Sequence, residues 1–173
     1  REGEQKAVLE HMSEFSEIIK MPKGATLDGG DVIFFDDRYL IGRSTRTNKE
    51  GGDFLASHVK KDGYDAEFIT VPDTTLHLTT VCSSPREGTI IAAEGHLTEH
   101  QLSNFAEEIL WVPNKESYAS NTIGYSNDRL IIAAGFPKTK NILQNEGFRL
   151  MSVDMAPIMQ ADGSLTCLSV YTS

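Results

Sequence analysis

Apolar and polar residues follow the same order in three stretches of the chain. In each stretch a short apolar segment leads through a polar turn into a second apolar segment, a helical pattern and a third apolar segment. Short apolar runs bounded by turn residues predict strands, and apolar positions three and four residues apart predict a helix. The sequence therefore predicts three ββαβ units, over residues 31–71, 78–112 and 121–153.

Local signals support the helices of these units. Thr98 and Gln101 fit a capping box at the start of the second helix. Pro137 suits the first position of the third helix. The predicted strands cover residues 31–35, 39–42, 67–71, 78–81, 89–93, 109–112, 121–125, 130–134 and 148–153.

Repetition of one unit restricts the architecture. A ββαβ unit covers one face of its sheet with its own helix and leaves the flanks of the sheet to its neighbours. Repeated at a spacing of some tens of residues, such units favour an α/β propeller or array over an open Rossmann sheet. A generic α+β domain, in which the similarity of the three stretches is a coincidence, is the alternative.

The N-terminal segment has a helical pattern of its own. Val8, Met12, Phe15 and Ile19 recur at steps of four and three residues, which predicts one amphipathic helix. The chain begins at Arg1 without an initiator methionine, and no element precedes this helix to cover its apolar face. We therefore expect a preceding segment to complete the fold, and we expect this chain alone to be poorly stable or to aggregate.

Composition narrows the class of protein. The 173 residues suffice for one domain with a substantial core, and 39% hydrophobic with 24% charged residues is ordinary for such a domain. A net charge of −9 disfavours a nucleic-acid surface but leaves a small cationic ligand open. No apolar run reaches the length of a membrane span, and the residues after Arg1 lack the pattern of a signal peptide, so neither a membrane span nor a signal peptide is expected. The two cysteines show no metal or disulfide spacing, which predicts a cytoplasmic location.

Cys167 is the candidate nucleophile. It follows the turn signal Asp162-Gly163 and begins the short apolar run 168–170, so we expect it at the start of a strand, facing a cavity. A thiol in that position can attack an electron-poor carbon. A lone cysteine is more often a small buried hydrophobe, and Cys82, inside an apolar strand pattern, is predicted to be one.

His77 and Asp28 are its candidate partners. His77 stands at a loop–strand junction, where an imidazole can exchange protons with a substrate. Asp28 precedes two glycines, which let the backbone approach a ligand while the carboxylate points into a cleft. A structural histidine and a simple turn before a strand are the alternatives. His96 and His100 have helical i,i+4 spacing but lack a third ligand, so no metal site is predicted.

Five segments together resemble the dimethylarginine dimethylaminohydrolase family, and they cover nearly the whole chain in the family's order. They are 25–32, 42–48, 75–83, 112–121 and 161–170, with the sequences ATLDGGDV, GRSTRTN, TLHLTTVCS, VPNKESYASN and ADGSLTCLSV. The resemblance implies an α/β fold of the pentein type, a propeller of ββαβ modules around a pseudo-fivefold axis. With about three full modules, a flanking N-terminal helix and a C-terminal strand carrying the cysteine, residues 1–173 are expected to form a single catalytic domain, incomplete at the N-terminus.

The resemblance assigns three catalytic residues: Cys167 as nucleophile, His77 as general acid and base, and Asp28 as the carboxylate that holds the substrate. It implies hydrolysis of N-methylated arginine, such as dimethylarginine, to citrulline and a methylamine through a covalent cysteine intermediate. No metal or organic cofactor is expected. An arginine deiminase or amidinotransferase of the same fold is the alternative within enzymes, and a non-catalytic truncated module is the alternative outside them.

The resemblance also assigns substrate-binding residues. Arg46 would hold the α-carboxylate of the substrate, Arg1 would be a second binding arginine, and the backbone carbonyl of Ala161 would accept from the α-amino group. The expected partner is a small-molecule methylarginine, with neither nucleic acid nor membrane, and a homodimer is left open. Arginine deiminases place an aspartate two residues after the histidine, and here that position is Thr79. This favours a methylated substrate, because a methylated guanidinium has fewer N–H groups that need an acceptor.

Overall fold

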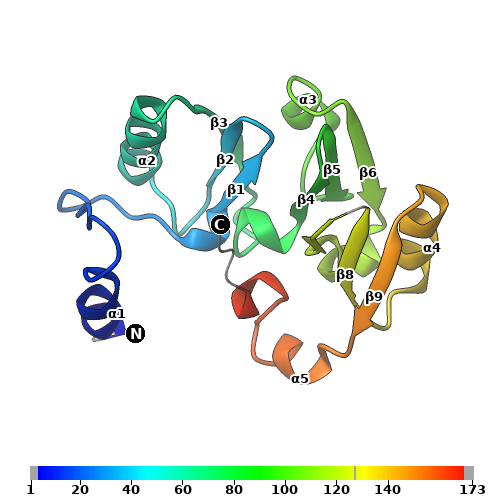
Figure 1. Cartoon of the computed structure of the whole chain (residues 1–173). Helices are drawn as coiled ribbons and strands as arrows, with labels where there is room; N and C mark the ends of the chain where they lie inside the picture. The colour runs from blue at the N-terminus through cyan, green and yellow to red at the C-terminus, as the bar shows by residue number, and fades with distance from the viewer. Residues whose placement is uncertain (1–3, 127, 170–173) are drawn as a thin grey trace.

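The computed structural model describes residues 4–126 and 128–169 and contains three small mixed sheets, one for each predicted unit (Figure 1). In each sheet the first two strands form an antiparallel hairpin, and the third strand pairs in parallel with the second. A helix connects the second and third strands of each unit. The three predicted ββαβ units are therefore confirmed.

The elements have these bounds. The first unit comprises β1 (Val32–Phe35), β2 (Arg38–Arg43), α2 (Lys49–Lys61) and β3 (Asp65–Thr70). The second comprises β4 (Cys82–Arg86), β5 (Thr89–Ala93), α3 (Glu99–Leu102) and β6 (Glu108–Val112). The third comprises β7 (Ile123–Gly124), β8 (Arg129–Ala133), α4 (Pro137–Asn145) and β9 (Arg149–Val153). Outside the units lie α1 (Glu4–Met12), α5 (Ala156–Met159) and the 3₁₀ helices η1 (Gly29–Asp31), η2 (Leu78–Thr80), η3 (Asn114–Ser120) and η4 (Thr166–Leu168).

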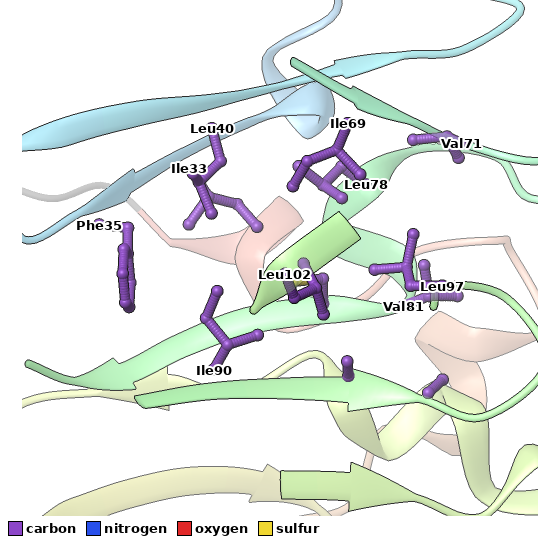
Figure 2. Close-up of a cluster of buried hydrophobic side chains, with 13 residues drawn as sticks. Ile33, Phe35, Leu40, Ile69, Val71, Leu78, Val81, Ile90, Leu97 and Leu102 are labelled. Carbon is purple, nitrogen blue, oxygen red and sulfur yellow. The ribbon is translucent and has the colours of Figure 1, made fainter. Parts of the chain in front are cut away.

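The hydrophobic core lies between neighbouring units. Side chains of the first unit, among them Phe35 and Leu40, meet Ile90 and Leu102 of the second unit in one buried cluster (Figure 2). A second cluster joins the second unit to the third. Each fully buried aliphatic side chain contributes about 1.5–3 kcal/mol, so these shared clusters are the main force that holds the units side by side.

The N-terminal helix is shorter than predicted. α1 ends at Met12, and a turn follows in which the Ser13 hydroxyl donates to the Glu10 carbonyl. Phe15 is 71% exposed and Ile19 is 55% exposed, both outside the helix. The prediction of one helical face through Ile19 was therefore wrong. Helices of this length depend on tertiary packing, and serine side chains compete for backbone groups where packing is weak.

Two predicted strands are 3₁₀ turns instead. Residues 78–80 form η2, and the strand of that region begins only at Cys82. Cys167 lies within η4 and not in a strand: its N–H donates to the Ser164 carbonyl. In both places the backbone is turned back on itself and held by side chains from elsewhere in the chain. No helix in the described part of the chain is both long and apolar enough to cross a membrane.

Candidate active site

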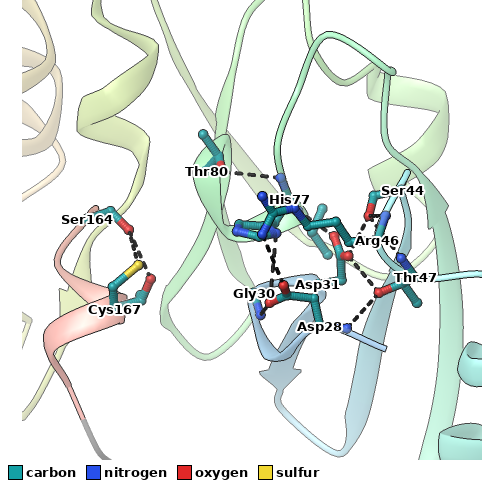
Figure 3. Close-up of polar contacts among 12 residues, drawn as sticks. Asp28, Gly30, Asp31, Ser44, Arg46, Thr47, His77, Thr80, Ser164 and Cys167 are labelled. Atoms are coloured by element: carbon teal, nitrogen blue, oxygen red, sulfur yellow. Dashed lines mark hydrogen bonds and ion pairs between the residues drawn. The ribbon is translucent and has the colours of Figure 1, made fainter. Parts of the chain in front are cut away.

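One cavity of about 1020 Å³ gathers most of the predicted site residues. It is lined by residues of η1, of the loop before α2, of the η2 region and of the C-terminal segment. Figure 3 shows two groups, one around Asp28 and His77 and the other at Cys167. Five of the six predicted site residues line this cavity, namely Asp28, Arg46, His77, Ala161 and Cys167. The sixth, Arg1, lies outside the described residues.

Asp28 caps the short helix η1. Its Oδ1 accepts from the Gly30 N–H at 3.0 Å, and its own N–H donates to the Thr47 hydroxyl. The Arg46 Nη1 lies 3.5 Å from Oδ2. Partial burial acts to raise the pKa of Asp28, but the Gly30 N–H, His77 and Arg46 together outweigh it and hold that pKa below its ordinary value. Asp28 therefore presents an ionised carboxylate to the cavity at neutral pH.

The His77 ring is held by packing. It lies against Gly30 so closely that a Cβ there would stand 2.8 Å from the ring atoms Cγ and Cδ2. Its Nδ1 is buried and has no hydrogen-bond partner among the described residues. The Asp28 Oδ1 lies 3.8 Å from that nitrogen, beyond hydrogen-bond distance. The imidazole is thus fixed in place beside a carboxylate, an arrangement suited to proton transfer.

Asp31 is a site residue that the sequence did not reveal. The carboxylate is fully buried and accepts three hydrogen bonds: from the Ser44 hydroxyl at 2.6 Å, the Thr47 hydroxyl at 2.7 Å and the Leu78 N–H at 2.9 Å. It therefore joins η1, the loop that carries Arg46 and the segment that carries His77 (Figure 3). The only sequence signal was its place as the second aspartate of the LDGGD segment.

The two thiols differ sharply. Cys167 is exposed at the cavity, with its Sγ 3.4 Å from the Ser164 hydroxyl. Tyr118 lies nearby and donates to the Gly163 carbonyl at 2.8 Å; burial and the neighbouring Cys167 raise the pKa of Tyr118. Cys82 is buried, as predicted, and burial raises the pKa of its thiol to about 12. Only Cys167 therefore combines a thiol with open access to the cavity.

The two histidines with helical spacing have different surroundings. The His96 Nδ1 shares a hydrogen bond with the Thr75 hydroxyl at 2.8 Å, and His100 is exposed. Within residues 4–126 and 128–169, no group of three or more histidine, cysteine, aspartate or glutamate side chains is placed to hold a metal ion.

The chain is similar in sequence to several known proteins. No protein-family model matches the chain. It is 28% identical to the N(G),N(G)-dimethylarginine dimethylaminohydrolase of Pseudomonas aeruginosa over 172 residues, which cover 98% of this chain and 66% of that protein. It is 33% identical to the enzyme of the same name from Streptomyces coelicolor over 146 residues, which cover 84% of this chain and 54% of that protein. The chain thus spans less than two thirds of the length of these relatives.

Solved structures agree. The Pseudomonas aeruginosa protein, as a cysteine-to-serine mutant complexed with citrulline, superposes with a TM-score of 0.85 at 28% identity, covering 96% of this chain and 65% of that one. The arginine dihydrolase ArgZ, with a TM-score of 0.79 at 17% identity, and the amidinotransferase SxtG, with 0.76 at 16%, show the shared fold alone. In sequence, fold and residue order the chain is therefore similar to dimethylarginine dimethylaminohydrolases, and its fold is of the pentein type.

Proposed function

We propose that this protein hydrolyses N-methylated arginine, such as dimethylarginine, to citrulline and a methylamine through a covalent intermediate on Cys167. One observation carries the proposal: a thiol, an imidazole and a carboxylate from distant parts of the sequence line a single cavity. The names of the relatives and the citrulline held by one of their structures support this choice of substrate class.

The first half of the reaction forms the covalent intermediate. The Cys167 thiolate attacks the guanidinium carbon, and an S–C bond forms while a C–N π pair moves onto nitrogen. Asp28 accepts hydrogen bonds from the guanidinium N–H groups and keeps the substrate cationic and aligned. A free thiol has a pKa of about 8.5, so the bound cation and His77 have to favour the thiolate. His77 then protonates the methylated nitrogen, and the C–N bond breaks to release the amine.

The second half restores the enzyme. His77, now without its proton, takes one from a water molecule, and the resulting hydroxide attacks the thiouronium carbon. The C–S bond breaks and its electron pair returns to Cys167 as the thiolate. The new oxygen gives up its remaining proton to solvent, and neutral ureido citrulline leaves. One histidine thus supplies a proton in the first half and removes one in the second.

Two further residues would orient the substrate. Arg46 is exposed at the cavity and carries a positive charge, which suits an α-carboxylate. The Ala161 backbone carbonyl stands in the segment before Cys167, where it can accept from an α-amino group. Arg1 keeps its assignment as a second binding arginine from the resemblance alone.

Thr79 favours this reaction over arginine deimination. Arginine deiminases resemble one another in placing a second carboxylate at this position, and here a threonine lines the cavity. A site with one carboxylate cannot accept hydrogen bonds from all the N–H groups of an unmethylated guanidinium, and each N–H group left unpaired costs about 1–3 kcal/mol. An amidinotransferase, which would pass the amidino group to an amine in place of water, is supported by fold likeness only.

Citrulline formation by the wild type and by Cys167→Ser tests the proposal. We expect turnover of dimethylarginine by the wild type and none above background by the variant, with an unchanged circular dichroism spectrum. A turnover rate of Cys167→Ser equal to that of the wild type would contradict the assignment of Cys167 as the nucleophile. A higher kcat/KM for arginine than for dimethylarginine would favour the deiminase.

Labelling with a haloacetamidine separates the enzyme from a non-catalytic module. We expect rapid, pH-dependent alkylation that Cys167→Ala removes and Cys82→Ala retains. Labelling no faster than that of the buried Cys82 would favour the non-catalytic alternative.

A further inference from the structure

Asn121 is a buried amide between the two halves of the candidate site. It follows η3, is 1% exposed and belongs to the segment 112–121, to which the sequence assigned no role. Its Nδ2 donates to the Thr79 carbonyl at 2.6 Å and to the Thr166 hydroxyl at 2.9 Å. Its Oδ1 accepts from the Thr166 N–H at 3.2 Å. Both polar atoms of the amide are therefore engaged.

These partners stand next to the reacting groups. Thr79 lies two residues after His77 in η2, and Thr166 comes directly before Cys167 in η4. Both helices are 3₁₀ turns of three residues, whose own hydrogen bonds are few and poorly aligned. Their relative position consequently depends on tertiary contacts, and one planar amide spans the distance between them.

Helix η3, which ends directly before Asn121, reinforces this connection. From the same helix, the Tyr118 hydroxyl donates to the Gly163 carbonyl at 2.8 Å, which holds the loop before Cys167. Thr79 and Thr166 line the cavity, whereas Asn121 is not among the described residues that line it. Asn121 can thus act on the reaction only through the groups that it holds, which are the backbone of Thr79 and Thr166 and the Thr166 hydroxyl.

We propose that Asn121 is a positioning residue that sets the Cys167 sulfur against His77 and Asp28; this rests on the proposed function. An asparagine is required because the position needs donors and an acceptor on one short, flat group. An aspartate of the same size supplies acceptors only, and one of its oxygens would face the Thr79 carbonyl oxygen. A glutamine is one methylene too long for a site with 1% exposure.

Alkylation kinetics of Cys167 test the proposal without requiring turnover. 2-Chloroacetamidine carries a planar cation that Asp28 can hold while the thiolate displaces chloride, whereas iodoacetamide is neutral. The ratio of the two second-order rate constants reports how well the sulfur is aligned with the cation site. A displacement of about 1 Å can cost up to about 100-fold in rate, so we expect Asn121→Asp to lower this ratio at least about tenfold.

Asn114 provides the matched control. Asn114 is the first residue of η3, the helix that Asn121 follows. Its amide also donates to a backbone carbonyl, that of Glu94 at 2.9 Å, but on the exposed surface. We expect Asn114→Asp to leave the ratio unchanged. A ratio within twofold of the wild type in folded Asn121→Asp would overturn the proposal. If Asn121→Asp does not fold, Thr166→Val can be measured instead, because it removes only the hydroxyl partner of Asn121. A ratio of the two alkylation rate constants lowered about threefold supports the proposal, and an unchanged ratio overturns it.

Turnover then separates the two proposals. In an active wild type we expect Asn121→Asp to lower kcat for dimethylarginine with KM within about twofold, because substrate contacts remain and alignment is lost. A raised KM with unchanged kcat would overturn the positioning role. Absence of turnover in the wild type would overturn the proposed function, while the alkylation ratio would still decide the role of Asn121.

Discussion

The two glycines that follow Asp28 have different surroundings. A Cβ on Gly29 would meet nothing within 4 Å, whereas a Cβ on Gly30 would stand 2.8 Å from two atoms of the His77 ring. The backbone at Gly30 therefore lies close to the His77 side chain, and the absence of a Cβ lets the imidazole pack against η1. The sequence predicts that both glycines make room for a ligand, whereas the structure shows that Gly30 makes room for the His77 ring.

We expect Gly30→Ala to displace the His77 ring. The added methyl group overfills a packed contact, which typically costs about 1–3 kcal/mol of unfolding free energy. Urea denaturation measures that loss, and NMR of the His77 ring protons reports the displacement. Gly29→Ala is the matched control, and we expect it to change neither the unfolding free energy nor the NMR signals of the His77 ring protons appreciably. Equal effects of the two substitutions would show that the His77 contact is not the cause.

Helix α4 is capped by a residue of another element. Its own N-cap residue, Phe136, provides no side-chain hydrogen bond to the first turn. The Glu116 carboxylate of η3 accepts hydrogen bonds from this turn instead. Glu116 accepts from the Thr139 N–H at 2.7 Å, the Thr139 hydroxyl at 2.8 Å and the Lys138 N–H at 3.3 Å. Burial acts to raise the pKa of Glu116, but these donors outweigh it and lower that pKa. A negative charge at a helix N-terminus is stabilising, so α4 and η3 support each other.

Glu116→Gln should lower stability by about 1 kcal/mol at pH 7, since it removes a charged cap. The pKa of Glu116 is lower in the folded than in the unfolded protein. The ionised carboxylate therefore stabilises the fold fully at pH values above the pKa of the unfolded state, and this contribution is lost as the pH falls through the pKa of the folded state. The difference in unfolding free energy between the wild type and Glu116→Gln should therefore become smaller below about pH 4.5. Urea denaturation at pH 7 and at acid pH measures this.

Glu87→Gln is the control, because Glu87 is exposed. Its unfolding free energy should stay within about 0.5 kcal/mol of the wild type. A Glu116→Gln difference that persists unchanged at low pH would contradict the capping role.

At the scale of the whole molecule, polar contacts hold the units in order. The Asp36 carboxylate in the β1–β2 turn accepts from the Gly88 N–H in the β4–β5 turn. Arg86 of β4 contacts Glu108 and Asp128, each at 3.1 Å, and so connects the second unit to the third. These contacts and the shared core explain why three small sheets form one body (Figure 1).

The outer units expose apolar side chains. Phe34 of β1 is 50% exposed and Met151 of β9 is 53% exposed. Exposed apolar side chains and open strand edges favour association. The expectation that this chain alone is poorly stable or aggregates therefore stays a prediction, to be measured by sedimentation velocity across a range of concentrations. Met151→Lys should reduce association, whereas Arg149→Lys on the same strand should not. A monodisperse 19.1 kDa monomer with a cooperative thermal transition would refute it.

The sequence by itself determined the repeated units, because their signals are local. Apolar periodicity predicted the helices of the three units and their strands except β4. The capping box of Thr98 and Gln101 marks the start of α3, and Pro137 opens α4. The sequence also predicted five of the residues that line the cavity, because their chemistry and the family's motifs can be recognised from residue type and order: Asp28, Arg46, His77, Ala161 and Cys167. Burial of Cys82 followed from its apolar neighbours in the same way.

Only the tertiary structure decided the conformations that carry the site. Local pattern placed His77 and Cys167 at strand starts, but both lie at 3₁₀ turns. The Leu78 N–H is taken by Asp31, 47 residues away, and the Thr166 N–H by Asn121, 45 residues away. Hydrogen bonds between residues so far apart leave no periodic trace in the sequence, so they can override local preference without being predictable from it. The end of α1 was decided likewise, because a short helix persists only where tertiary packing covers its apolar face.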